Sequence, residues 1–183
     1  DGKVKEQLDD PEAWDNGSEL WVPWTKTVER QSQAWGLRMQ IPEWWLGYRG
    51  GSATEELETK DEEGEAGAIA AYLLPTSSFM LHVNHVATVE EALAYWKEFL
   101  LSDNDPSIRF VKEETETWRG RTAMRVQLTG LTTDGDIAHT SDMLLIAKDG
   151  YVYTLCYEII DVSRTPEMVE QFEQVVDSIQ FTS

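Results

Sequence analysis

The pattern of hydrophobic and polar residues along the chain first predicts strands. Between residues 35 and 41, apolar residues alternate with polar or small ones, which predicts a strand that ends at Pro42. Two more strands are predicted at Ala68–Leu74 and Phe79–Val86, because a Pro-Thr-Ser-Ser turn separates these two apolar runs. The chain up to residue 86 is therefore expected to contribute three strands.

Apolar residues at helical spacing predict two helices. The first follows Thr88, which forms a capping box with Glu91, and the polar stretch 102–106 ends it. The second spans 166–178, with Thr165 as its N-cap and a proline at its first position. The core-facing residues of the second helix are expected to be Met168, Val169, Phe172, Val175, Val176 and Ile179. One apolar face on each helix predicts that both pack against a sheet.

Four strands are predicted between the two helices. They lie at Ile108–Thr117, Thr122–Leu131, Ile137–Ala147 and Tyr151–Ile159. Their connections are short, so consecutive strands are expected to be antiparallel. The last connection, Asp149-Gly150, is typical of a type I′ hairpin turn, in which both central residues need positive backbone dihedrals.

These elements predict an α+β fold. We expect an α/β/α sandwich with a central, mainly antiparallel sheet of about six or seven strands, flanked by helices. In the strand at 122–131, positions 124, 126 and 128 are apolar and the positions between them are polar, so one face of that strand should be buried and the other half-exposed. Residues 1–20 are polar and turn-rich and are interpreted as an N-terminal tether or arm, and residues 21–183 as a single domain.

The charge of the chain limits its partners. The sequence has 34 acidic and 15 basic side chains, for a formal net charge of −19. Such a chain repels phosphate backbones and anionic membranes, so nucleic acid is excluded as a partner. A solvated surface explains this charge, and a cation site or a basic protein partner is the alternative. Cys156 is the sole cysteine and lies in an apolar run, which predicts a buried, inert thiol and no intrachain disulfide. The sequence contains no run of about 18 apolar residues, so no transmembrane segment is predicted within these 183 residues.

Two groups of residues are candidates for binding. Trp44, Trp45 and Tyr48 form an aromatic segment that either contacts a ligand or partner or packs into the core. Two acidic turns contain Asp103 with Asp105 and Asp134 with Asp136. Closely spaced carboxylates can hold a hard cation such as Ca²⁺, although ordinary turns explain the same residues. No other cofactor is predicted.

The sequence contains no recognisable catalytic motif. His82 and His85 are three apart on a predicted strand and so face opposite sides, as do His139 and Asp142. Neither a nucleophile elbow nor a glycine-rich phosphate loop occurs. We therefore predict that the protein is not an enzyme.

The order of elements resembles that of the PsbP-like fold family. The likeness covers Trp35 to Phe181 and rests on the stretches Leu37–Trp44, Lys148–Tyr153 and Phe172–Phe181. That family includes the extrinsic oxygen-evolving protein of photosystem II, a Ran-binding nuclear import factor and bacterial envelope lipoproteins of unknown role. For bacterial members the resemblance implies a cleaved signal peptide and a lipid-anchored cysteine, here upstream of residue 1, with residues 1–20 as the tether.

Three classes of function follow. The preferred one is a non-catalytic, extracytoplasmic, lipoprotein-like protein, expected to be monomeric, that binds a protein partner or a small molecule. The first alternative is a carrier of a lipid or other apolar small molecule, which requires a large apolar cavity. The second is a hydrolase or isomerase with an unrecognised carboxylate site, which requires two acids with perturbed pKa values in one cleft.

Overall fold

The computed structural model describes residues 26–46, 67–101, 107–131 and 137–182. Its strands are β1 (Thr27–Ser32), β2 (Leu37–Pro42), β3 (Ala68–Leu74), β4 (Ser77–Asn84), β5 (Arg109–Trp118), β6 (Arg121–Leu131), β7 (Ala138–Lys148), β8 (Tyr151–Ile160) and β9 (Gln180–Phe181). Its helices are α2 (Glu43–Leu46), α3 (Val89–Leu101) and α4 (Pro166–Ser178), and a 3-10 turn, η2, spans Asp161–Ser163.

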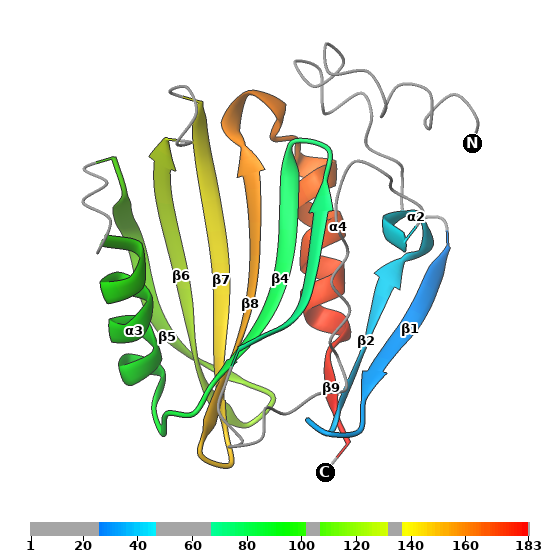
Figure 1. Ribbon diagram of the computed structural model, residues 1–183, viewed down its shortest axis with the longest axis vertical. Coiled ribbons are helices and arrows are strands. Elements are labelled where there is room, and N and C mark those ends of the chain that lie inside the picture. The colour runs from blue at the N-terminus through cyan, green and yellow to red at the C-terminus, as the bar shows by residue number, and fades with distance from the viewer. Residues whose placement is uncertain (1–25, 47–66, 102–106, 132–136, 183) are drawn as a thin grey trace.

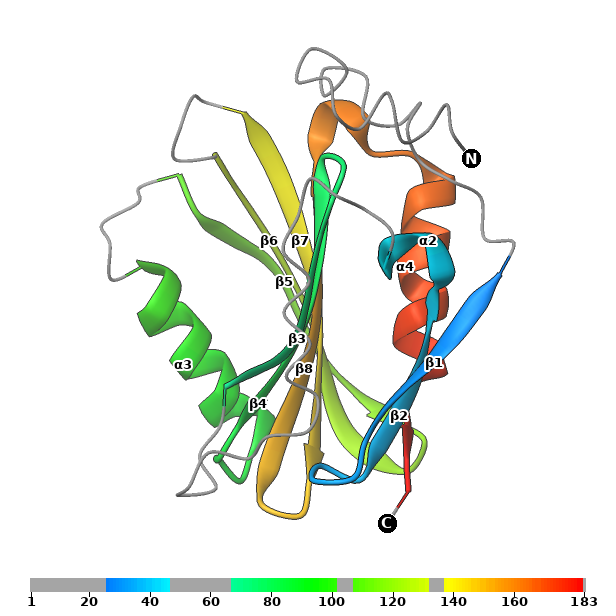
Figure 2. The same cartoon turned by 45° about the vertical axis from the view of Figure 1, so that its right-hand side comes forward.

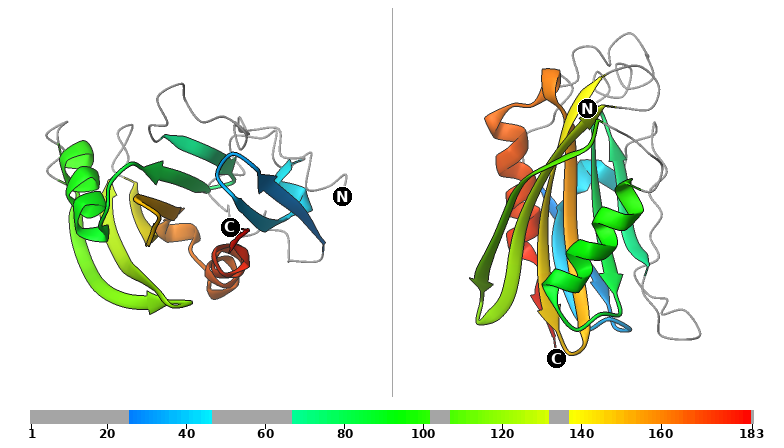
Figure 3. Two further views of the ribbon diagram at one scale, coloured as in Figure 1. Left: turned by 90° about the horizontal axis from the view of Figure 1, so that it is seen from below. Right: turned by 90° about the vertical axis from the view of Figure 1, so that its left-hand side faces the viewer.

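The strands form two antiparallel sheets (Figure 1). Six of them make a large sheet in the order β3-β4-β8-β7-β6-β5, and the other three make a small sheet in the order β1-β2-β9. Helix α3 covers one face of the large sheet, whereas α4 and the small sheet lie on the opposite face (Figure 2, Figure 3). The predicted α+β sandwich, with an antiparallel central sheet of six strands flanked by helices, is confirmed.

Each face of the large sheet has its own hydrophobic core, because successive side chains of a strand point to opposite faces. On the α3 face, Trp96 lies over the sheet and its indole N–H donates to Thr154 Oγ1 at 3.2 Å. On the α4 face, Phe172 stacks on Tyr157 of β8 with 4.9 Å between ring centroids. The alternation predicted for β6 is confirmed, since Met124, Val126 and Leu128 are buried in the α3-side core.

The capping signals are confirmed at both helices. Thr165 accepts a hydrogen bond from the Met168 N–H at 3.2 Å, as expected of an N-cap before a helix that starts with proline. Thr88 accepts from the Glu91 N–H at 3.2 Å. The Glu91 carboxylate accepts from the Ala87 N–H at 2.9 Å, so its return bond goes to the residue before the cap.

The hairpin between β7 and β8 has the predicted turn. Asp149 and Gly150 have φ values of 53° and 82°, both in the left-handed region. The two strands pair without a register shift from Lys148↔Tyr151 to His139↔Ile160. The Asp-Gly turn therefore sets the register of the two strands, and this register determines which of their side chains lie on the α4 face.

Strand β1, helix α2 and the 3-10 turn η2 were not predicted from the sequence, and the first two show why. Strand β1 has the sequence TVERQS and only one fully buried residue, so it lacks the apolar alternation from which strands are predicted. It forms by pairing with β2 over its whole length. Helix α2 is a single turn of four residues, too short for a helical period to show in the sequence. Both elements depend on tertiary contacts with the chain around them.

His82 on β4 is a buried histidine that makes stability depend on pH. The ring lies edge-on to Trp96 at 4.9 Å, and Nδ1 is 3.2 Å from Asn84 Oδ1. Burial lowers the pKa of His82 below its ordinary value of 6.5, and the bond with Asn84 only partly opposes this shift.

We expect the His82→Phe variant to have a flatter stability profile than the wild type below pH 6.5. Between the lowered pKa of the folded state and 6.5, the unfolded chain binds more protons at this residue, so stability falls as pH falls. The contribution is at most about 1.4 kcal/mol per pH unit. Urea unfolding from pH 5 to 8 measures it, with the exposed His85 changed to Phe as the control. Parallel profiles for wild type and His82→Phe would contradict the prediction.

Candidate functional site

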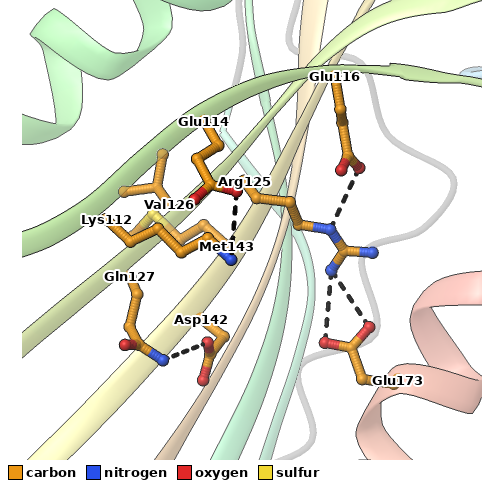
Figure 4. A pocket seen from close by; sticks show the side chains of 9 residues that line it. All are labelled: Lys112, Glu114, Glu116, Arg125, Val126, Gln127, Asp142, Met143 and Glu173. Atoms are coloured by element: carbon orange, nitrogen blue, oxygen red, sulfur yellow. Dashed lines mark hydrogen bonds and ion pairs between the residues drawn. The ribbon is translucent and has the colours of Figure 1, made fainter.

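A polar groove lies on the α4 face of the large sheet (Figure 4). It has a volume of ≈ 290 Å³. Its lining comes from β5, β6, β7 and α4, and consists of Lys112, Glu114, Glu116, Arg125, Val126, Gln127, Asp142, Met143 and Glu173. We call it the α4-side groove.

Strand pairing places the polar side chains of the groove on one face. Arg125 of β6 lies opposite Glu114 of β5, and Gln127 lies opposite Lys112 on β5 and Asp142 on β7. Directly paired residues in antiparallel strands share a face of the sheet. Helix α4 packs over β8 and β4, where Phe172 contacts the rings of the strands beneath it. The polar face of β5 and β6 therefore lies beside the helix, and the groove forms along that border.

Arg125 connects β5, β6 and α4. Its Nε donates to Glu116 Oε1 at 3.3 Å, and its Nη1 lies 3.1 Å from Glu173 Oε2 and 3.3 Å from Oε1. Glu173 also accepts a 2.7 Å hydrogen bond from the Tyr157 hydroxyl. Burial alone would lower the pKa of Arg125, but the charges of Glu173 and Glu116 outweigh burial and raise it. The guanidinium is therefore held, fully charged, between two carboxylates.

Tyr157 of β8 supports this ion pair through its hydroxyl group. Burial raises the pKa of its hydroxyl, and the hydrogen bond to Glu173 raises it further. The hydroxyl therefore keeps its proton and acts as a donor to the carboxylate. Because Tyr157 stacks on Phe172 of α4, the same side chain joins the core to the groove.

A second set of contacts holds the β7 side of the groove. Gln127 Nε2 donates to Asp142 Oδ1, and Arg164 Nη2 donates to Asp142 Oδ2, both at 2.9 Å. On β5, Lys112 Nζ lies 3.4 Å from Glu114 Oε2, and both side chains are about half exposed or more. The groove lining contains four carboxylates and two cations; with Arg164, which pairs with the lining residue Asp142, the formal excess is one negative charge. It is thus suited to bind a polar or positively charged group.

The aromatic residues proposed from the sequence have different locations. Trp45 is 2% exposed and its ring centroid lies 5.5 to 5.6 Å from those of Tyr72, Phe79 and Phe172. Trp44 is half-buried and packs against the same core. Trp45 therefore packs in the core between α4 and the large sheet. Core packing was one of the two alternatives that the sequence left open for this residue, and contact with a ligand or partner was the other. Tyr48 lies outside the described residues.

The acidic turns proposed as cation sites, with Asp103, Asp105, Asp134 and Asp136, lie outside the described residues. Within the part of the chain that the structure describes, no group of three or more His, Cys, Asp or Glu side chains is placed to hold a metal ion. His82 is buried under α3, whereas His85 stacks on Tyr151, 4.6 Å between centroids. The two histidines do not meet.

His139 and Asp142 lie on opposite faces of β7, as predicted. His139 Nε2 is 3.6 Å from Glu158 Oε2, which also accepts a 3.0 Å hydrogen bond from Ser141. Asp142 instead lines the α4-side groove. Cys156 is buried, as predicted, and burial raises the pKa of its thiol.

The groove itself was not predicted from the sequence. The polar half of β6 was recognised, but the residues that complete the groove come from distant segments. Glu173 is 48 positions from its partner Arg125, and Arg164 is 22 positions from its partner Asp142 on β7. The available signal was the pair Arg125 and Gln127 on a face that the strand pattern marked as half-exposed. A charged side chain on this face of an interior strand requires a hydrogen-bond or ion-pair partner. The sequence does not show which residue that partner is, because it depends on how α4 packs against the sheet.

Comparison with solved structures connects this fold to known proteins. The solution structure of the cyanobacterial PsbP protein (CyanoP) from Synechocystis sp. PCC 6803 superposes with a TM-score of 0.60 at 9% sequence identity, covering 85% of this chain and 92% of that one. The chain has a PsbP-like fold. No family model matches the sequence, and no curated protein matches it.

Two other solved structures superpose on this PsbP-like chain more loosely. One is a protein of unknown function from Pseudomonas aeruginosa described as a putative regulator, with a TM-score of 0.47, 11% identity and coverage of 84% of this chain and 96% of that one. The other is LpqN, involved in cell envelope biogenesis of Mycobacterium tuberculosis, with a TM-score of 0.40, 11% identity and coverage of 86% and 85%. Among the described helices of this chain, none is long and apolar enough to span a bilayer.

Proposed function

We propose that this PsbP-like protein is a non-catalytic binding or interaction protein that acts outside the cytoplasm, and that the α4-side groove is its binding surface. One observation carries the proposal: charged side chains from three strands and a helix converge around one hollow of ≈ 290 Å³. Small-molecule pockets are mostly apolar with a few convergent polar groups. This groove is lined mainly by charged side chains, which favours recognition of a charged partner through electrostatic complementarity. The polar lining favours a polar or charged ligand over the apolar cargo of a lipid carrier.

The chemistry of the groove supports binding rather than catalysis. The described residues that line it include no Ser, Cys or His, the usual nucleophiles and proton carriers. Its carboxylates are engaged instead, Glu116 and Glu173 by Arg125 and Asp142 by Gln127. Such a network presents a fixed pattern of charge to a ligand, because each side chain is held by a neighbour.

The extracytoplasmic location rests on the resemblance to PsbP-like envelope lipoproteins. The strongly acidic composition agrees with a protein that stays in solution near a membrane rather than lying on its anionic surface. Residues 1–20 would serve as the tether, and this role remains part of the proposal.

A steric block of the groove tests the proposal. The Lys112→Trp variant places a large ring in the groove, whereas Thr115→Trp places the same ring on the other face of β5. Each variant and the wild type would be isolated from the envelope and secreted fractions of the host and examined by native mass spectrometry. We expect a co-purifying mass with the wild type and Thr115→Trp that is lost with Lys112→Trp.

Two results would contradict the proposal. A bound mass that survives in Lys112→Trp would place the binding surface elsewhere on the protein. A protein found in the cytosolic fraction, and bare in all three forms, would argue against both the location and the binding role.

A further inference from the structure

We propose that the α4-side groove receives an arginine side chain from an exposed segment of a basic partner protein. This inference rests on the proposed function, because it names the chemistry of the ligand of the same groove. Charge complementarity carries it, together with the way in which the groove already binds a guanidinium of its own chain.

The charge balance selects a cationic occupant. The groove has four carboxylates in its lining against Lys112, Arg125 and the Arg164 that pairs with Asp142, within a chain that has 34 acidic and 15 basic side chains. A second copy of this chain would bring the same excess of negative charge, so self-association through the groove is opposed. A basic segment instead gains attraction both at long range and on contact.

The geometry of the groove suits a guanidinium better than an ammonium. Arg125 already lies between Glu116 and Glu173, with one nitrogen on the first carboxylate and another on both oxygens of the second. Those two carboxylates are occupied by Arg125, but Glu114 is paired with the exposed Lys112, and a guanidinium that displaces this lysine can form a bidentate, fork-like pair with both oxygens of Glu114. An ammonium is a more strongly hydrated point charge and gains less from such a fork.

Glu114 is the acceptor most accessible to an incoming arginine. Its side chain is 66% exposed and its ion pair with Lys112 spans 3.4 Å between two exposed side chains. Exposed pairs of this kind contribute little free energy, so Lys112 can be displaced at small cost. The incoming guanidinium would then lie on Glu114, on the solvent side of Arg125, which faces Glu114 across the strand pair.

The position of β5 gives a partner segment access to the groove. β5 is the last strand of the large sheet and pairs with β6. Lys112, Glu114 and Glu116 occupy alternate positions along it, so they line the same face at intervals of about 6.8 Å. An extended segment that runs beside β5 therefore passes these side chains in turn, and its own alternate side chains reach the groove.

Peptide binding to the purified full chain tests this inference. Fluorescence anisotropy would measure a short labelled peptide with two arginines, and matched peptides with two lysines or two glutamates, at about 150 mM salt, where long-range attraction is screened beyond about 8 Å. We expect the arginine peptide to bind most tightly, and the glutamate peptide not to bind. The double variant Glu114→Gln/Glu116→Gln should weaken arginine binding by about tenfold.

A matched control separates the groove from the overall charge. Glu90→Gln/Glu98→Gln removes two carboxylates from exposed positions of α3, on the opposite face of the sheet, and should leave affinity within about twofold of the wild type. Equal losses in both double variants would show diffuse attraction and overturn the inference. Glu114→Gln alone provides a second variant, because Glu114 is exposed and its pair with Lys112 adds little stability.

The two proposals can fail separately. If Lys112→Trp removes a host-derived mass but no arginine peptide binds, the groove is a binding surface and this inference is wrong. Tighter binding of the lysine or glutamate peptide would also overturn it.

Discussion

Replacing Trp45 with alanine should lower the free energy of unfolding by about 3 to 5 kcal/mol. The side chain is 2% exposed and contacts the rings of Tyr72, Phe79 and Phe172, which come from β3, β4 and α4. Its loss would leave a large cavity where α2 closes the α4-side core, and the flanking rings belong to strands and a helix that can relax only in part. Urea unfolding measured by circular dichroism gives the value.

Phe99→Ala is the matched control for this prediction. Phe99 is also aromatic, but its side chain is 57% exposed on α3, so its truncation should cost less than about 1 kcal/mol. A loss below about 1 kcal/mol for Trp45→Ala as well would contradict a core role for Trp45 and return it to the candidates for binding. The pair of variants therefore decides between the two functions that the sequence allows for this tryptophan.

Local signals made most of the fold predictable. Thr165 caps α4 and Asp149-Gly150 turns the β7–β8 hairpin because their preferences act over two to four residues of chain. The apolar stripe of α4 was predicted for the same reason, and Phe172, Val175 and Val176 are buried. These features need no knowledge of distant residues, so a single sequence is enough to identify them.

The elements that were missed depend on distant contacts. β1 has polar residues at most positions and becomes a strand through its pairing with β2, and the small sheet is completed when Leu37 pairs with Phe181 near the C-terminus. α2 follows Pro42 as one turn whose Trp45 inserts into the core. Sequence patterns report neither the partner of an edge strand nor the depth at which a tryptophan is buried.

The candidate site was still harder to predict, because it is made from charge pairs between elements. On the sequence, Glu173 is an ordinary polar position on an amphipathic helix, and Asp142 is one polar residue in an apolar strand. The role of Glu173 follows from the packing of α4 beside β6, which brings it to Arg125, and the connection between η2 and α4 brings Arg164 to Asp142. The acidic turns that attracted notice in the sequence, by contrast, lie outside the described residues.

Arg125 joins the stability of the fold to the shape of the groove, which makes it the most informative single position there. Its guanidinium links β5 through Glu116 to α4 through Glu173, and its side chain is 26% exposed. Arg125→Met keeps the length and apolar stem of the side chain and removes the charge. Glu173 retains the Tyr157 hydroxyl as a donor, so we expect the free energy of unfolding to fall by about 1 to 3 kcal/mol, less than a fully buried, unpaired carboxylate would cost.

A double-mutant cycle assigns this loss to the ion pair. Arg125→Met, Glu173→Gln and the combined variant should give a coupling energy of about 1 kcal/mol in urea unfolding, since the two side chains share one network. Lys26→Met breaks the exposed pair of Lys26 with Glu43, 3.1 Å apart, and should cost less than about 0.5 kcal/mol. If Arg125→Met costs no more than Lys26→Met, the groove is not held by this network, and Glu173 is free to move when a ligand binds. If the cycle gives the expected coupling, the carboxylates of the groove are fixed before a partner arrives, so a guanidinium docks without first ordering them.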